Sequence, residues 1–78
     1  MSDFFCFASA KVGQKCKVVM LDEKLEEKIF RRLCEFGFCK DAEIEIVRWS
    51  VLGKSCIVKI ASGDVVMRKN IVEGIFVR

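Results

Sequence analysis

Residues 33–38, with the sequence Leu-Cys-Glu-Phe-Gly-Phe, describe a helix end that leads directly into a strand. The apolar residues that approach this point recur at spacings of four, four and three, and they are Leu25, Ile29, Leu33 and Phe36. Such spacing puts them on one face of a helix, and an apolar face of this kind needs a core to bury it. Gly37 suits the left-handed conformation that ends many helices, and Phe38 can then contact Leu33 in a Schellman-type stop.

The beginning of this helix is also marked. Asp22 stands where an N-cap side chain accepts hydrogen bonds from the first free backbone N–H groups. Glu23, Glu26 and Glu27 follow, and negative charge at this end interacts favourably with the helix dipole. We therefore expect the helix to begin directly after Asp22.

Alternating apolar and polar residues predict the strands. The clearest is residues 42–47, where Ile44 and Ile46 alternate with glutamates, as in a strand with one buried and one wet face. The other expected strands are residues 15–21, 56–61, 65–67 and 75–77. The alternation breaks at residues 47–49, where a bulge would let Trp49 change side. We expect the helix face to pack on a sheet core of Val18, Ile44, Ile46, Val58 and Ile60.

The segments between the strands are short. Residues 50–55 are a connection with Gly53 as its turning point, residues 62–64 a tight hairpin turn, and residues 69–74 a single helical turn. Five short strands with one inserted helix, no repeat and no proline describe a mainly β protein, a small and strongly bent sheet or barrel. A chain of 78 residues has room for one domain, residues 1–78.

Composition argues against a membrane or nucleic-acid protein. Hydrophobic residues make up 53% of the chain, yet no run approaches the roughly 20 apolar residues that cross a bilayer. Residues 1–8 are apolar, but they have no basic leader and are too short for a signal peptide, so we expect a cytoplasmic protein. The net charge of +3 comes from interleaved charges of both signs, which gives little support for nucleic acid as a partner.

Five cysteines without an export signal favour free thiols over a disulfide framework, and they are Cys6, Cys16, Cys34, Cys39 and Cys56. Cys34 and Cys39 flank the helix end without a Cys-x-x-Cys pair or a histidine, so no metal site is expected. Cys16 and Cys56 lie in predicted strands, where cysteine serves as a small buried hydrophobe.

The chain offers no catalytic constellation. Histidine and tyrosine are absent, so a cysteine nucleophile would lack its usual base. Glu43 and Glu45 share one strand face, but solvated strand charges explain them better than a catalytic pair. No phosphate-binding or dinucleotide-binding glycine motif is present. We therefore expect no enzymatic activity and no cofactor.

The order and spacing of these signals resemble the FeoA family. The matching positions are Gly13 and Val18, the Leu33-x-x-Phe36-Gly37-Phe38 helix end, residues 42–46, residues 50–53, residues 63–68, and Ile75-x-Val77. The chain departs from the family pattern at Lys40-Asp41, where a proline-glycine turn is usual, and around Leu52-Gly53, where two prolines are missing.

The resemblance implies an SH3-like barrel of about five strands with one inserted helix. It also implies a small cytoplasmic accessory protein of bacterial ferrous-iron transport, which binds the cytoplasmic part of the FeoB permease without inserting into the membrane. One alternative is a regulatory domain akin to that of metal-dependent repressors. Another is a nucleic-acid-binding barrel that uses Trp49 near Arg48 and Lys54. The oligomeric state and any direct binding of iron or another transition metal stay open.

The expected partner surface is Trp49, Val51, Leu52 and Gly53. Apolar residues in a connection between strands more often serve recognition than stability. Trp49 is the largest apolar side chain and the kind of residue that dominates binding energy. The alternative is that Trp49 and Leu52 fold back to close one end of the barrel.

Overall fold

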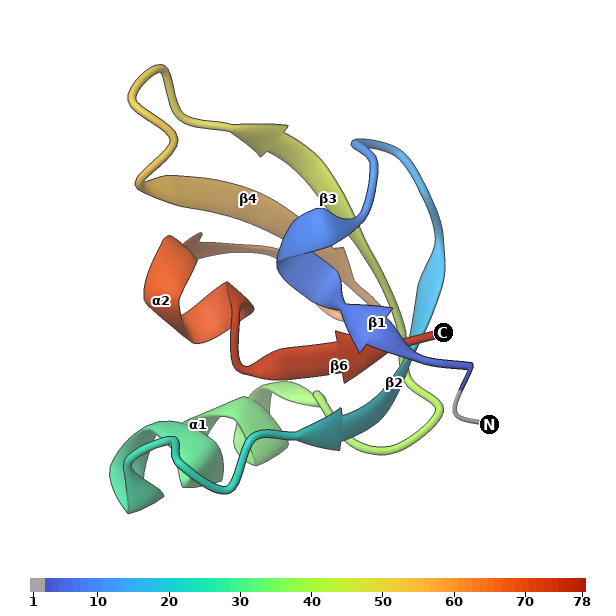
Figure 1. The fold of residues 1–78 in the computed structure, drawn as a ribbon, viewed down its shortest axis with the longest axis vertical. Coiled ribbons are helices and arrows are strands. Elements are labelled where there is room, and N and C mark those ends of the chain that lie inside the picture. The colour runs from blue at the N-terminus through green and yellow to red at the C-terminus, as the bar shows by residue number, and fades with distance from the viewer. Residues whose placement is uncertain (1–2) are drawn as a thin grey trace.

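Six antiparallel strands form one curved sheet in the order β1-β6-β2-β3-β4-β5 (Figure 1). The computed structural model describes residues 3–78. The strands are β1 (Phe5–Cys6), β2 (Cys16–Leu21), β3 (Glu43–Trp49), β4 (Ser55–Ile60), β5 (Gly63–Arg68) and β6 (Ile75–Val77). The helical elements are a 3-10 turn η1 (Phe7–Ser9), the helix α1 (Glu27–Phe36) and the single turn α2 (Lys69–Val72). The mainly β class with one inserted helix is thus confirmed, with six strands in place of about five.

The additional strand is β1, which the sequence did not predict. It has two residues, and it exists because Phe5 pairs with Val77 and Cys6 with Phe76 of β6. A strand this short has no alternation of its own, so only its partner defines it.

The bulge expected at residues 47–49 is present in β3. Ile46 pairs with Val58 of β4, the register then shifts, and Arg48 pairs with Ile57. Both Ile44 and Ile46 are buried ahead of this shift, whereas Val47 is exposed. The shift therefore ends the strict alternation of buried and exposed residues in the last part of β3, where the strand meets the β3–β4 loop.

The hairpin between β4 and β5 is one residue out of the expected place. Ile60 pairs with Gly63, so Ala61 and Ser62 form the loop, and Asp64 already pairs with Lys59. Gly63 has a φ of 136°, a conformation that suits glycine at the end of a tight turn.

The helix α1 begins four residues later than expected, at Glu27. The Asp22 carboxylate does accept a backbone hydrogen bond, at 2.9 Å from the Lys24 N–H, but it caps a separate turn. That turn is closed by the Leu25 N–H, which donates to the Asp22 carbonyl oxygen at 3.1 Å. Glu26 takes the N-cap position and makes no side-chain capping bond. The expected N-cap role of Asp22 is therefore wrong, because its short-range bond builds a turn before the helix.

The helix end is the expected Schellman stop. Gly37 has a φ of 102°. The Phe38 N–H donates to the Leu33 carbonyl oxygen at 2.9 Å, and the Gly37 N–H donates to that of Cys34 at 3.1 Å. These are the two hydrogen bonds that define this motif.

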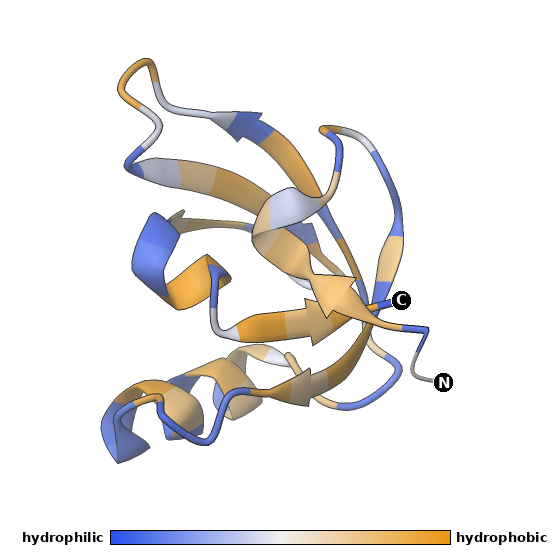
Figure 2. Cartoon of the chain, in the orientation of Figure 1, coloured by the Kyte–Doolittle hydropathy of each residue, from blue (hydrophilic) through white to orange (hydrophobic). Residues whose placement is uncertain are grey.

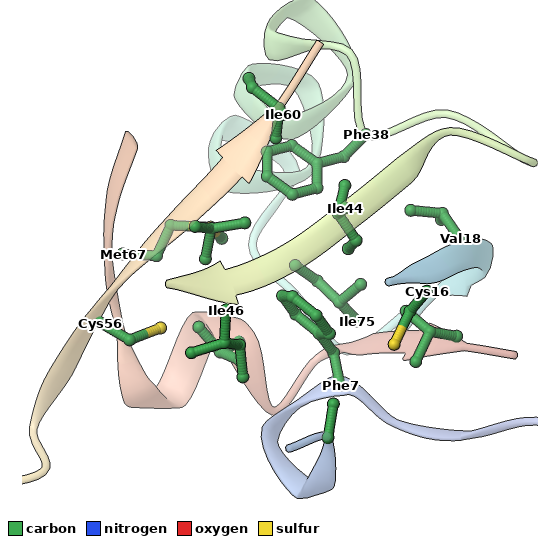
Figure 3. Close-up of a cluster of buried hydrophobic side chains, with 14 of the residues drawn as sticks. Phe7, Cys16, Val18, Phe38, Ile44, Ile46, Cys56, Ile60, Met67 and Ile75 are labelled. Atoms are coloured by element: carbon green, nitrogen blue, oxygen red, sulfur yellow. The ribbon is translucent and has the colours of Figure 1, made fainter. Parts of the chain in front are cut away.

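The hydrophobic core lies inside the curved sheet, with α1 at one end (Figures 1 and 3). All five expected sheet residues are buried: Val18, Ile44, Ile46, Val58 and Ile60. Leu33 is buried as predicted, but Leu25 and Ile29 are only partly buried and Phe36 is 51% exposed. Phe38, not Phe36, completes the core, since the left-handed Gly37 turns the chain back under the helix.

The N-terminal segment contributes more to the core than its sequence suggested. Phe7 in η1 is fully buried, and Figure 3 shows it beside Ile46 and Ile75. Between residues 3 and 78, none of the helices has the length and apolar character needed to span a bilayer.

Candidate partner-binding surface

The connection between β3 and β4 is a structured loop. The Ser50 N–H donates to the Ser55 carbonyl oxygen at 2.8 Å, and the Gly53 N–H donates to that of Ser50 at 2.9 Å. The Ser50 hydroxyl oxygen accepts from the Lys54 and Ser55 N–H groups at 3.2 and 3.3 Å. Gly53 has a φ of 70°, so the expected turning point is confirmed. Four hydrogen bonds around one serine hold this loop in shape without the prolines that the family pattern would supply.

The tip of this loop presents two apolar side chains to solvent. Val51 is fully exposed at 103% and Leu52 is 78% exposed. Figure 2 shows the tip as an orange segment that projects from the rest of the barrel. Burying such side chains against a partner releases free energy of about 25 cal/mol per Å² of apolar surface, and the ordered loop has little conformational freedom left to lose.

The two residues of the folded-back alternative behave differently. Trp49 is partly buried and packs against the core, as that alternative expected. Leu52 does not fold back, because most of its side chain is in solvent. Of the four expected residues, Val51 and Leu52 therefore form the accessible part, Gly53 shapes the loop, and Trp49 anchors its base.

A shallow groove of about 330 Å³ lies beside the loop base. It brings Trp49 and Val51 together with Arg48, Ile57 and Val66 from β3, β4 and β5. Val66 is 75% exposed, and the strand predicted for residues 65–67 did not identify it as part of a surface. The adjacent valines 65 and 66 were the available signal, since one of two neighbouring strand residues must face away from the core. The groove offers apolar contact and one guanidinium, which suits recognition of another protein.

The cysteines lie apart from this surface or beneath it. Cys16 and Cys56 are buried, as predicted, while Cys34 and Cys39 are exposed. Burial raises the pKa of both interior thiols, from 9.0 to about 11 for Cys56. Glu43 is exposed and Glu45 partly exposed, as expected for solvated strand charges. Within residues 3–78, no group of three or more His, Cys, Asp or Glu side chains is arranged to hold a metal ion.

Solved structures with the same fold include those of a FeoA protein and of an iron(II) transport protein. The solution structure of the FeoA protein from Chlorobium tepidum has 27% identity and a TM-score of 0.87, over 95% of this chain and 69% of that chain. That of iron(II) transport protein A from Clostridium thermocellum has 24% identity and a TM-score of 0.84, over 95% and 44% respectively.

A manganese-dependent transcriptional repressor has the same fold at 15% identity, with a TM-score of 0.86 over all of this chain and 37% of that chain. Among curated proteins, none matches the sequence significantly. The FeoA domain, by contrast, matches residues 7–78, which include every element except the first strand. The chain therefore belongs to the FeoA family.

Proposed function

We propose that this protein is a non-enzymatic, cytoplasmic accessory protein of ferrous-iron uptake, and that it binds the cytoplasmic part of an FeoB-like permease. Membership of the FeoA family supports the link to iron transport. The name of the similar protein from Clostridium thermocellum, iron(II) transport protein A, points the same way. In this proposal the protein contributes a binding surface, and the transport chemistry belongs to the permease.

The observation that carries the binding mode is the exposure of Val51 and Leu52 on an ordered loop. An apolar pair at a loop tip can enter a hydrophobic pocket of a partner while the loop keeps its shape. Trp49 and the groove beside it then provide apolar contact next to the tip. Arg48, which is exposed at the same edge, can pair with a carboxylate of the partner.

The test measures binding of the Val51→Ser/Leu52→Ser variant to the purified cytoplasmic part of an FeoB permease from the same organism. We expect binding to weaken by tenfold or more, because truncation of interface anchors costs about 2 kcal/mol or more. Thermal melting should be unchanged, since neither side chain belongs to the core. Val12→Ser is the matched control, because Val12 is an exposed valine on a different loop.

Equal binding by the double variant and the parent would show that this loop is not the contact surface. Absence of binding by the parent itself would remove the permease from the proposal. Salt-sensitive binding of the parent to duplex or single-stranded nucleic acid would instead favour the nucleic-acid alternative.

A further inference from the structure

A second groove lies between α1 and β5. Its volume is about 480 Å³, within the range of roughly 300–1,000 Å³ typical of binding sites. Most of its wall is apolar, with Ile29, Leu33, Phe36 and Phe38 on the α1 side and Val65, Val66, Met67 and Ile71 on the β5 and α2 side. Figure 1 places α1 at the end of the molecule away from the β3–β4 loop. Of residues 3–78, only Val66 lines both grooves.

One wall of this groove is an open sheet edge. β5 is the last strand in the sheet. One edge of β5 pairs with β4, and its other edge pairs with no strand of residues 3–78. Ile60 and Gly63 close the two-residue hairpin as a hydrogen-bonded pair, and such pairs alternate along an antiparallel ladder. The backbone groups of Asp64, Val66 and Arg68 consequently point away from β4. Among residues 3–78, no turn, loop or cap hydrogen bond uses these three N–H groups either.

The charges along the groove select the kind of partner. Arg32 of α1 and Arg68 of β5 line it, and both are exposed, while no acidic residue is among its lining residues. A guanidinium on each wall favours carboxylates on a segment that lies between them.

An open strand edge beside an apolar helix face is the arrangement that domains use to bind an extended peptide as an added strand. Main-chain hydrogen bonds then supply affinity, and pockets for alternate side chains supply specificity. We propose that the groove binds an extended acidic and apolar segment of a partner protein, which adds to β5 as a further antiparallel or parallel strand. Its alternate apolar side chains enter the groove over Leu33 and Met67, and its carboxylates pair with Arg32 and Arg68.

This site goes beyond the permease-binding loop and does not depend on it. The experiment uses the isotopically labelled whole chain and a synthetic peptide of about six alternating leucine and threonine residues, a typical strand length, flanked by glutamates. We expect the amide resonances of Asp64, Val66 and Arg68 to shift and to become protected from hydrogen exchange, because these N–H groups gain partners.

Two control peptides separate the contributions. The first carries N-methyl groups at the alternate backbone nitrogens that would face β5, and it should fail to bind. The second has lysines in place of the glutamates and should bind more weakly than the parent peptide.

Protein variants complete the test. Arg32→Glu and Arg68→Glu should each weaken the acidic peptide roughly tenfold, as expected for loss of a charge-assisted hydrogen bond, and should strengthen the lysine peptide. Leu52→Ser on the β3–β4 loop should bind the acidic peptide as the parent does, so failure of the loop proposal would leave this result unaffected.

Three results would overturn the proposal. The first is that the β5 amides do not shift at about 1 mM peptide, where binding with a Kd of about 1 mM is visible. Arginines that only protect the strand edge from aggregation would give this result. The second is that the N-methylated peptide binds as well as the parent peptide. The third is that the same amides shift when the protein is concentrated without peptide, which would mean that a second copy of the chain occupies the groove.

Discussion

Gly74 lies directly against Leu25, so close that a Cβ atom added to the glycine would stand 2.8 Å from Cδ2 of the leucine. The same two segments are joined by the Asp22 N–H, which donates to the Gly74 carbonyl oxygen at 2.7 Å. The turn that precedes α1 is thereby fixed to the turn that precedes β6, although the two are distant in the sequence.

Gly74→Ala should destabilise the protein because the new methyl group must displace Leu25. Overpacking of this kind costs about 1–3 kcal/mol. Urea unfolding measures the loss, and Leu25→Ala provides the control, since the double variant should lose less stability than the two single changes added together. Additive effects would mean that the destabilisation by Gly74→Ala does not come from the contact with Leu25.

Leu33→Ala should cost about 2–5 kcal/mol, the range for a buried leucine. In a domain of this size that loss lowers the melting temperature by roughly 10 °C or more. Phe36→Ala on the same helix is the matched variant, because Phe36 is half-exposed and should change the melting temperature much less. If the two variants melt alike, Leu33 does not occupy the core position that the structure gives it.

Alkaline pH should destabilise the fold through Cys56. Burial raises the pKa of this thiol from 9.0 to about 11 in the folded protein. Between these values the unfolded thiol loses its proton while the folded one keeps it, so the unfolded state binds fewer protons and stability falls as pH rises. The limiting slope is about 1.4 kcal/mol per pH unit for one group. The effect is absent below pH 9 and reaches its full extent above the folded pKa.

Urea unfolding of the parent and of Cys56→Ala between pH 8 and 11 isolates this contribution, since the two proteins share every ionisable group except the Cys56 thiol. The difference in unfolding free energy between the two should change across this interval. A constant difference would mean that the folded thiol ionises as readily as the unfolded one.

Thiol reactivity should divide the cysteines by exposure. Cys34 and Cys39 are exposed and should react with an aromatic disulfide reagent in the native protein, whereas Cys16 and Cys56 should react only after denaturation. Denatured, non-reduced protein should yield all five thiols. Fewer than five would reveal a disulfide.

A strong chelator should leave the unfolding curve unchanged, because the apolar core and not a ligand set holds the described residues together. Unfolding curves with and without chelator make the comparison. Loss of structure on chelation would show that cysteines or carboxylates serve as ligands.

Much of the fold could be predicted because local chemistry and tertiary packing agree at particular residues. Ile44 and Ile46 alternate with glutamates and form β3, and Gly37 ends α1 with the expected hydrogen bonds. The burial of Phe38 in place of Phe36 could not be read from helical spacing, because it depends on the direction in which Gly37 returns the chain.

The remaining differences share one physical cause, which is that a partner distant in the sequence decides the outcome. β1 is a strand only beside β6. The N-terminal part of the predicted helix is a turn, closed at Asp22 and fastened to Gly74. The sequence did place the β3–β4 loop and its two apolar residues, but the open edge of β5 follows from the strand order, which no local pattern contains.

The position of β6 between β1 and β2 has a consequence for biosynthesis. Phe5 pairs with Val77, which is translated much later than Phe5, and β2 also needs β6 to complete its pairing. At ribosomal speeds of roughly 5–20 residues per second, the nascent N-terminal segment waits on the order of 10 s for this partner. Phe7 and Val18, whose burial the finished barrel provides, are exposed in that interval. The pairing of β1 and β2 with β6 is therefore a late event in synthesis, and until then the apolar N-terminal segment is the kind of exposed surface that chaperones bind.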